Sequence, residues 1–487
     1  MQRECASRKP MDDNYIFENM PIHKALMKLA LPAVFSQIML VIYNMADTFF
    51  ISITQSNAKI AAVALCMPSL MVFNAIANLF GVGAASVISR ALGKSDIRRA
   101  KDACAFSFWG CMLATISFSA LSMAFANPIT DFLGGINPEI HKYSLDYIKF
   151  TTIYCGWTIS IPILMSHIVR SEGHSVLASI GIVSGGIINI MLDPLLMFVI
   201  LDEGNEVAGA AIATSLSNVI SFCYYMAVIA IMRKKKKAIS MKLRKSCFER
   251  SIPRCILGAG LPAFAMTFAE NLSYAVLDRL MATAGTIFQA GIAVAKKINM
   301  LSHSIIRGLT QGALPLLGYA YSTGNRMKTK RIAYLTLSTA FVISTLILAA
   351  NLIFTSGLVS LFLSPENPSG GYAADFLKIL ALGCPTSAIA YAFISFFQAV
   401  GHGKESLVLA LMRKGMLDIP LMFILQLIIT TYGIVWATPI TDAICCIASV
   451  IAFVRFSERH LKKNKRRKTY DPKTDTYIIK EPCDEQP

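Results

Sequence analysis

The sequence is short of charged residues. Only 15% of its 487 residues are Asp, Glu, Lys or Arg, whereas 55% are hydrophobic. A soluble domain carries roughly 25% charged residues, so this chain lacks the polar groups that usually cover a water-facing surface. The mean hydropathy of +0.55 points the same way. The composition therefore predicts a membrane protein.

Motifs of enzymes and metalloproteins are also lacking. No G-x-x-x-x-G-K-[ST] phosphate-binding loop occurs, so nothing in the sequence suggests ATP as the energy source. The twelve cysteines show no metal-binding spacing, and no Ser/His/Asp arrangement can be argued. The first 24 residues are polar and show no signal peptide. We therefore expect neither an enzyme nor a protein with a cofactor or a structural metal.

Long apolar runs, by contrast, follow one another along almost the whole chain. Each is long enough to cross a bilayer, which takes about 20 residues in a helix. The runs cover 25–53, 60–89, 103–126, 147–168, 176–201, 207–232, 256–281, 287–317, 332–357, 376–400, 406–430 and 433–456. Because a helix satisfies its own backbone groups in lipid, these runs predict an all-α polytopic membrane protein with about twelve transmembrane helices.

The net charge of +17 is distributed by membrane side. Basic residues cluster in alternate loops, at 90–101, 233–254, 326–331 and 462–468. The intervening loops are acidic or neutral, as the positive-inside rule predicts for a plasma-membrane protein with both termini in the cytoplasm. No nucleic-acid-binding motif accompanies the charge, so we expect no nucleic-acid partner. The four lysines at 234–237 are suited to contact with anionic membrane lipids.

The sequence also repeats itself. Residues 260–281 echo 30–51, and 401–423 echo 173–198, where MLDIPLMF repeats the pattern of IMLDPLLMF. An even number of spans in each copy starts both copies on the same side, so they are parallel repeats, with a cleft between them near the bilayer midplane. Transport substrates bind in such clefts, so the repeat predicts a transporter.

The repeat gives the expected domain boundaries. They are a cytoplasmic N-terminal tail (1–24), a first six-helix lobe or N-lobe (25–232), a basic cytoplasmic linker (233–255), a C-lobe (256–457) and a cytoplasmic C-terminal tail (458–487).

Several segments together carry a family resemblance. They are LALPAVFSQIMLVIYNMADTFFI (29–51), SRALGKSDIRRA (89–100), RSEGH and NIMLDPLLMF within 170–198, GAAIATSLSN (209–218) and GLTQGALPLLGYAYSTGN (308–325). The order and spacing of these segments over residues 20–458 resemble those of the multidrug and toxic compound extrusion (MATE) family, in the branch typical of Gram-positive bacteria. The resemblance implies a monomer of two six-helix lobes in a V shape. It also implies export of small-molecule drugs or organic cations against an inward flow of H⁺ or Na⁺, with no cofactor.

An acid in the fifth apolar run suggests where that flow is coupled. A charged group at mid-helix costs about 2.5–3.5 kcal/mol on insertion scales, and such acids usually face cavities. Asn189 and Asp193 are four residues apart and share one helical face. The resemblance implies that this face meets Asp47 of the first helix and Thr214 of the sixth. Two such carboxylates cannot easily both be charged, so we expect the four residues to bind Na⁺ or share a proton. In the alternative interpretation, Asp193 caps a kink at Pro194.

The C-lobe offers a rival site. Glu270 lies eight residues after Pro262, which matches the cation-site glutamate of another MATE branch, but that branch also needs an acid within 376–400, and none occurs there. We therefore expect Glu270 to bind a cationic drug directly. The substrate-binding candidates are Glu270, Gln37, Asn271, Arg307 and Gln311.

Two points of the C-lobe stay open. Arg307 is a possible counter-charge for Glu270, but the sequence does not fix that pairing. Asp418, the counterpart of Asp193, is expected to form a structural pair with Arg413 and Lys414, one turn away at the lobe interface.

Two other functions remain as alternatives. Flippases or exporters of lipid-linked saccharides and other amphiphiles share this general architecture, so a lipid-linked substrate is the second hypothesis. A receptor or ion channel is the third, and it lacks support because the sequence shows no pore-loop motif or voltage-sensor arginine series.

Overall fold

The computed structural model describes residues 15–54, 56–133, 138–202, 204–234, 239–249, 251–363, 367–461, 468–471 and 476–479. The predicted tails (1–24 and 458–487) and linker (233–255) therefore lie partly outside the described residues, as do three of the four lysines at 234–237. The described part is helical, apart from one antiparallel pair of strands near the C-terminal end, β1 (Lys468–Asp471) and β2 (Thr476–Ile479).

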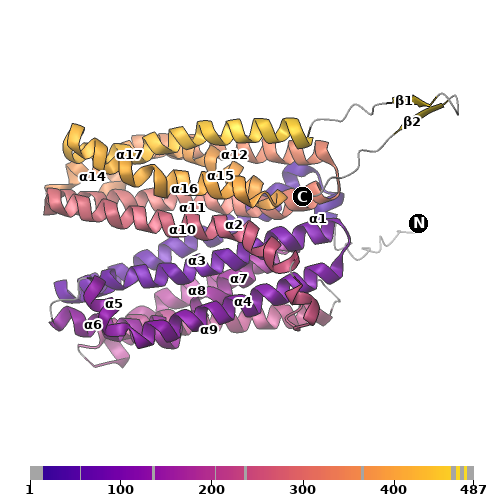
Figure 1. Cartoon of the computed structure of the whole chain (residues 1–487). Helices are drawn as coiled ribbons and strands as arrows, with labels where there is room; N and C mark the ends of the chain where they lie inside the picture. The colour runs from indigo at the N-terminus through magenta and orange to yellow at the C-terminus, as the bar shows by residue number, and fades with distance from the viewer. Residues whose placement is uncertain are drawn as a thin grey trace, which may run out of the picture.

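The first half of the chain forms one helical bundle, drawn from indigo to magenta in Figure 1. Its elements are α1 (Tyr15–Glu18), α2 (Ile22–Ile53), α3 (Asn57–Gly93), α4 (Ile97–Ala124), α5 (Ala126–Leu133), α6 (Pro138–Ile148), the π-helix η1 (Lys149–Tyr154), α7 (Gly156–Ser171), α8 (Ser175–Leu195), the π-helix η2 (Leu196–Ile200) and α9 (Glu206–Lys234). The 3₁₀ helix η3 (Lys245–Phe248) lies in the connection to the second half.

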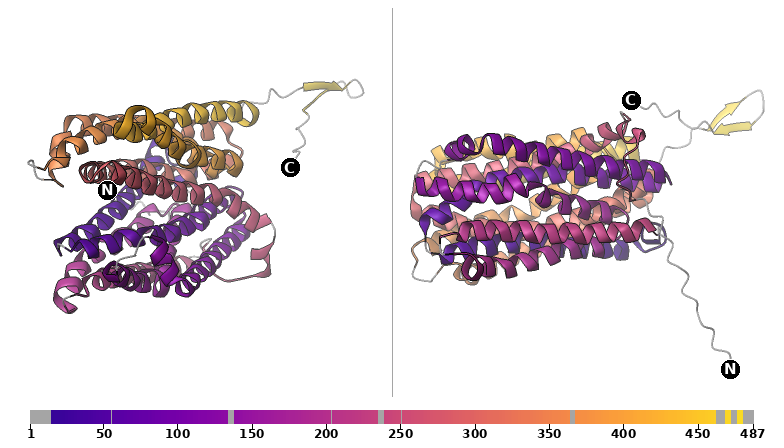
Figure 2. Two further views of the ribbon diagram at one scale, coloured as in Figure 1. Left: turned by 60° about the vertical axis from the view of Figure 1, so that its left-hand side comes forward. Right: turned by 90° about the horizontal axis from the view of Figure 1, so that it is seen from below.

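The second half forms the other bundle, drawn from pink to yellow. Its elements are α10 (Ser251–Ala284), α11 (Thr286–Ser322), α12 (Arg326–Ile353), α13 (Thr355–Ser360), α14 (Ser369–Leu382), α15 (Cys384–Val400), α16 (Gly403–Leu411), the π-helix η4 (Met412–Met416), α17 (Asp418–Phe456) and the π-helix η5 (Ser457–Leu461). Figure 2 shows that the helices of both bundles run roughly along one common direction.

The described helices make twelve membrane spans. Eight are long and apolar enough by themselves, and two bent pairs, α6 with α7 and α14 with α15, bring the number to ten. The stretch Gly403–Leu461, which comprises α16, η4, α17 and η5, is counted once among the eight. It holds two spans, because Thr430 within α17 has a non-helical φ of 55° and ψ of −135°. The chain turns back there, so that Gly433 packs against the backbone of Leu425. The remaining span is α11, which has 37 residues but carries several charged side chains.

The outer surface of the bundles is apolar. Large hydrophobic side chains point outward along many of the spans, and Leu427, Leu361 and Val199 are 88%, 75% and 73% exposed. A water-soluble monomer rarely exposes so much contiguous apolar surface, whereas lipid tails cover it without cost. The prediction of an all-α polytopic membrane protein with two parallel six-helix lobes is confirmed.

The two lobes are packed together at one end. We call this end the terminal face, because α2 begins there and η5, at the end of the twelfth span, lies there (Figure 1). Gly308 and Gly312 of α11 lie against the backbone of α2 at Ala30–Val34, and Gly260 of α10 lies against the carbonyl group of Leu79 in α3. A Cβ atom at any of these glycines would overlap the facing backbone. The lobes are therefore closed together at the terminal face.

Candidate functional site

Four polar side chains from three helices meet inside the N-lobe. Asn189 of α8 donates its amide to Asp193 Oδ1 at 3.2 Å and to Thr214 Oγ1 of α9 at 3.4 Å. The Thr214 hydroxyl donates to Asp47 Oδ2 of α2 at 3.5 Å. All four are buried, and Asp193 and Asp47 are only 0% and 4% exposed. The structure thus brings together the residues that the sequence predicted as the coupling cluster.

This N-lobe cluster, Asp47, Asn189, Asp193 and Thr214, contains spare acceptors. Asp47 Oδ1, Asn189 Oδ1 and Asp193 Oδ2 are buried and have no hydrogen-bond partner. A buried acceptor without a partner costs free energy, and a buried carboxylate without a counter-charge costs more. A proton or a small hard cation would satisfy these oxygens, because Na⁺ and H⁺ both bind to oxygen.

The local structure of α8 places two of these groups on one face. Asn189 and Asp193 are one turn apart, and α8 continues through Pro194 to Leu195 before the π-helix η2 begins. Within the described residues, the Asp193 carboxylate accepts from Asn189 and bonds no backbone group of the Pro194 turn. The contact therefore favours the cluster over the alternative in which Asp193 caps a kink.

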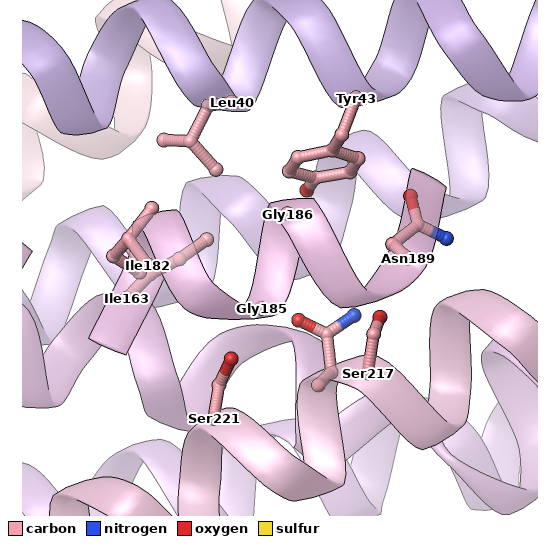
Figure 3. A pocket seen from close by; sticks show the side chains of 10 residues that line it. Leu40, Tyr43, Ile163, Ile182, Gly185, Gly186, Asn189, Ser217 and Ser221 are labelled. Carbon is pink, nitrogen blue, oxygen red and sulfur yellow. The ribbon is translucent and has the colours of Figure 1, made fainter. Parts of the chain in front are cut away.

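A small cavity adjoins the cluster. Its volume is about 20 Å³, which is room for about one water molecule. Figure 3 shows that Asn189 borders it, with Tyr43 of α2 on one side and Ser217 and Ser221 of α9 on another. Gly185 and Gly186 leave the space open on the α8 side. The cluster therefore has a partly polar approach lined by hydroxyl and amide groups.

In the C-lobe, by contrast, the predicted drug-site acid is already paired. Glu270 of α10 accepts from Arg307 Nη1 of α11 at 3.2 Å and from the hydroxyl of Tyr391 in α15, also at 3.2 Å. The side chain of Glu270 is buried, whereas that of Arg307 remains 24% exposed. This answers the open point about Arg307, which is the counter-charge of Glu270.

Two further ion pairs lie deeper in the C-lobe. Arg413 donates from Nε to Asp442 at 2.7 Å, and its guanidinium lies 4.1 Å from the ring centroid of Tyr391. Lys414 donates to Asp418 at 3.1 Å, and Asp418 also accepts from Ser273 and Thr438. The expected partnership of Asp418 with Lys414 is therefore confirmed. The expected one with Arg413 is wrong, because Asp442 lies nearer to that guanidinium.

Asp442 and Tyr391 were missed by the sequence analysis. Asp442 lies in the apolar run 433–456, where an acid carries the same signal that identified Asp193. Nothing in the sequence shows that Tyr391 would connect two ion pairs. Together with Lys296 and Asp278, which also form a pair, the C-lobe network balances four cations with four acids. The N-lobe cluster has two acids and no cationic partner among the described residues.

The remaining candidates lie near the interface between the lobes. Gln37 of α2 donates to Gln311 Oε1 of α11 at 3.1 Å, which is a direct hydrogen bond between lobes. Asn271 donates to the carbonyl group of Thr267 on its own helix, and the Thr267 hydroxyl accepts from Asn78 of α3. These amides therefore lie along the α2–α11 and α3–α10 contacts, whereas Glu270 and Arg307 lie within the C-lobe.

Comparison with known proteins gives one family and several relatives. Residues 32–195 and 262–424 match the family described as MatE, one segment in each lobe. The chain is 27% identical over 449 residues to the multidrug export protein MepA of Staphylococcus haemolyticus, covering 92% of this chain and 96% of that protein. It is 26% identical over 455 residues to MepA of Staphylococcus aureus, covering 91% and 96%.

Solved structures show the same fold. A MATE crystal structure in complex with MaL6 superposes with a TM-score of 0.85 at 23% identity, covering 94% of this chain and 100% of that chain. A structure described as the outward-facing conformation of a multidrug resistance MATE family transporter gives the same score, identity and coverage. A structure described as a MOP superfamily transporter from Pyrococcus furiosus gives 0.81, again at 23% identity and covering 94% and 100%.

Proposed function

This chain belongs to the MATE family, and from that premise we propose that it is a secondary active multidrug exporter of the plasma membrane. In this proposal it exports organic cations and other amphipathic drugs by antiport with H⁺ or Na⁺. The observation that carries the coupling part is the N-lobe cluster, where two buried carboxylates and the Asn189 amide leave three oxygens without a partner, and no cationic side chain among the described residues pairs with them.

The charge balance of the two lobes supports this division of labour. A coupling site must be stable both with and without its bound cation. An acid that is already neutralised by an arginine gains little from binding a further cation. In the described part of the chain the N-lobe cluster has no such neutralising cation, whereas Glu270 and Asp442 each have one at 3.2 and 2.7 Å. Coupling is therefore assigned to Asp47, Asn189, Asp193 and Thr214.

The drug is proposed to bind between the lobes. Gln37, Gln311 and Asn271 lie along that interface, and Arg307, the partly exposed partner of Glu270, lies on α11, the helix that carries Gln311. A cationic drug would compete with Arg307 for Glu270, or contact the amides and nearby aromatic rings. The glycine contacts close the terminal face, and the positive-inside rule places that face in the cytoplasm, so in this proposal the lobes are closed on the cytoplasmic side.

The energetics allow such a mechanism without ATP. One elementary charge that moves down 100 mV releases about 2.3 kcal/mol. That is enough to sustain a substrate gradient of roughly fifty-fold.

The test is efflux from proteoliposomes that contain the purified protein and a fluorescent cationic dye. An imposed H⁺ or Na⁺ gradient should drive dye movement, and ionophores that collapse the gradient should stop it. Asp47→Asn should abolish this gradient-driven movement, whereas Asp202→Asn, the same charge change at an exposed loop residue, should leave it intact. Undiminished driven efflux by Asp47→Asn would overturn the assigned coupling site. Transport of a lipid-linked saccharide without dye efflux would favour the flippase alternative.

A further inference from the structure

A second cavity, of about 510 Å³, lies between the two lobes at the terminal face. On one side it is lined by the end of α3 and the start of α4, and on the other by α10, the end of α11, the start of α12 and η5. Its volume falls within the range of about 300–1,000 Å³ that is usual for small-molecule sites. It is separate from the N-lobe cluster, with which it shares no residue.

The lining of this terminal cavity is strongly basic. Arg90, Lys94 and Arg99 come from the N-lobe, and Arg326 and Arg459 come from the C-lobe. Asp96 is the one acid among the described lining residues, and its carboxylate is used to cap α4, where it accepts from the Arg99 backbone at 2.9 Å. Tyr321 and His460 add groups that can donate hydrogen bonds. The cavity therefore offers many donors and few acceptors.

Like charges thus face each other across the closed lobes. Three cations of one lobe and two of the other share one space, and their repulsion opposes the closure that the glycine contacts bring about. An anion with several charges would reverse this balance, because it attracts both sides at once. Arginine guanidinium groups are suited to this role, since their planar donors match phosphate oxygens in pairs.

The cavity depends on the closed arrangement. Arg90 donates to the carbonyl group of Ser86 at 3.0 Å and packs against Gly401 of the C-lobe, where a Cβ atom would overlap the guanidinium. Arg99 lies 3.6 Å from the sulfur of Cys255 in α10. Two of its cations therefore touch the opposite lobe already, and separation of the lobes at this face would divide the cavity.

Membrane orientation alone does not account for this convergence. The positive-inside rule requires basic residues near the cytoplasmic ends of helices, but it does not require that both lobes direct them into one cavity. Arg98 and Arg331 lie on the same helices, α4 and α12, yet they are exposed and do not line the cavity. They serve as matched controls for the cavity cations.

We propose that the terminal cavity binds a phosphate-bearing anion with several negative charges, which bridges the two lobes and stabilises closure at the terminal face. An anionic lipid headgroup and a free polyphosphate-containing molecule share this chemistry. Because the ligand binds well only when the lobes are closed, it shifts the population toward that arrangement. The site is thus regulatory, and it does not depend on which cation drives export.

Binding is tested with inorganic triphosphate and the purified full-length protein in detergent, by calorimetry at constant ionic strength. We expect saturable binding that Lys94→Gln/Arg459→Gln weakens by about tenfold or more, since two charge-assisted contacts are lost. Both side chains are exposed, one in each lobe, so the variant should fold. The double control Arg98→Gln/Arg331→Gln removes the same charge outside the cavity and should bind like the wild type.

A second measurement reports on the cavity itself. Triphosphate should slow alkylation of Cys255, which lines the cavity, and should leave the exposed Cys223 unaffected, as read by peptide mass spectrometry. In nanodiscs, loss of triphosphate binding with cardiolipin, whose headgroup carries two phosphates, but not with phosphatidylcholine would identify a lipid headgroup as the ligand. Equal binding in both would identify a free anion. Absence of saturable binding, or equal weakening in both double variants, would overturn the proposal.

Discussion

Glu270 and Arg307 form an ion pair inside the C-lobe, at 3.2 Å between Oε2 and Nη1. The pair neutralises the acid that resembles a cation-site residue, and the Tyr391 hydroxyl occupies its other oxygen. Removal of one side chain of such a pair is strongly destabilising, because the other side chain is left charged and poorly solvated. Its two residues should therefore depend on each other for stability.

The first prediction is that Glu270→Gln lowers the free energy of unfolding by roughly 3 kcal/mol, and that Glu270→Gln/Arg307→Gln recovers most of that loss. The reason is that the double variant leaves no uncompensated buried charge. Thermal unfolding of the purified single and double variants checks this. Additive losses in the double variant would show that the two side chains are not energetically coupled.

Transport should respond differently to the same change. Glu270→Gln should alter the affinity for some cationic drugs, yet leave their export dependent on the H⁺ or Na⁺ gradient, since the N-lobe cluster is intact. Dye efflux from proteoliposomes, with and without ionophore, measures both properties. Complete loss of gradient dependence in Glu270→Gln would move the coupling site to the C-lobe.

The contact between α2 and α11 gives another prediction. A Cβ atom at Gly312 would overlap the backbone of Ala30, so Gly312→Ala must push the lobes apart at the terminal face. We expect a loss of about 1–3 kcal/mol of stability from this overpacking. Gly258→Ala is the matched control, because Gly258 lies in α10 with nothing near its Cβ position. The control should gain slightly from better helix propensity. A control-like result for Gly312→Ala would contradict the close approach.

The short helix α1 joins elements of both lobes. The ring of Phe17 stacks on Tyr319 of α11 with centroids 4.8 Å apart and lies near Gly173, just after α7. Lys328 of α12 donates to the carbonyl group of Phe17 at 2.6 Å. The N-terminal segment is therefore fastened across the terminal face.

Phe17→Ala should release this segment, because Phe17 is the fully buried side chain of α1 and truncation of a buried aromatic side chain costs about 3–5 kcal/mol. Limited proteolysis near residues 15–20 should become several-fold faster. Tyr15→Ala, on the exposed side of the same helix, should leave the cleavage rate unchanged. Equal acceleration in both variants would indicate that α1 is held by its backbone alone.

The sequence predicted the spans well because apolar runs of that length are stable in lipid as transmembrane helices, which satisfy their own backbone polar groups. Even the break within Gly403–Leu461 falls at the predicted boundary between 406–430 and 433–456. Helical periodicity alone placed Asn189 beside Asp193. The approach of Asp47 and Thr214 came from the family resemblance, since no local pattern says which helix faces meet.

The ion pairs of the C-lobe could not be assigned in the same way. Arg413 is one turn from Asp418 in the sequence, yet it bonds Asp442 of the twelfth span. The choice depends on how η4 and α17 pack, which is a tertiary property. The terminal cavity was missed for the same reason, because four of its five cations belong to the basic segments 90–101 and 326–331, which membrane orientation alone explains.

The last prediction separates coupling from stability at Asp193. Asp193→Asn keeps the shape of the side chain but removes one of two neighbouring acids that lie buried without a cationic partner among the described residues. Unlike Glu270→Gln, it should therefore leave thermal stability unchanged or raise it, because relief of like-charge repulsion offsets any lost contact.

At the same time, Asp193→Asn should remove the response of transport to an imposed H⁺ or Na⁺ gradient for every substrate, while equilibrium drug binding persists. The two measurements are dye movement in proteoliposomes and dye binding by fluorescence polarisation in detergent. Asp442→Asn is a useful contrast, since it leaves Arg413 buried without its partner and should destabilise the protein strongly. A destabilised Asp193→Asn with intact gradient response would mean that this acid serves the fold and not the transport cycle.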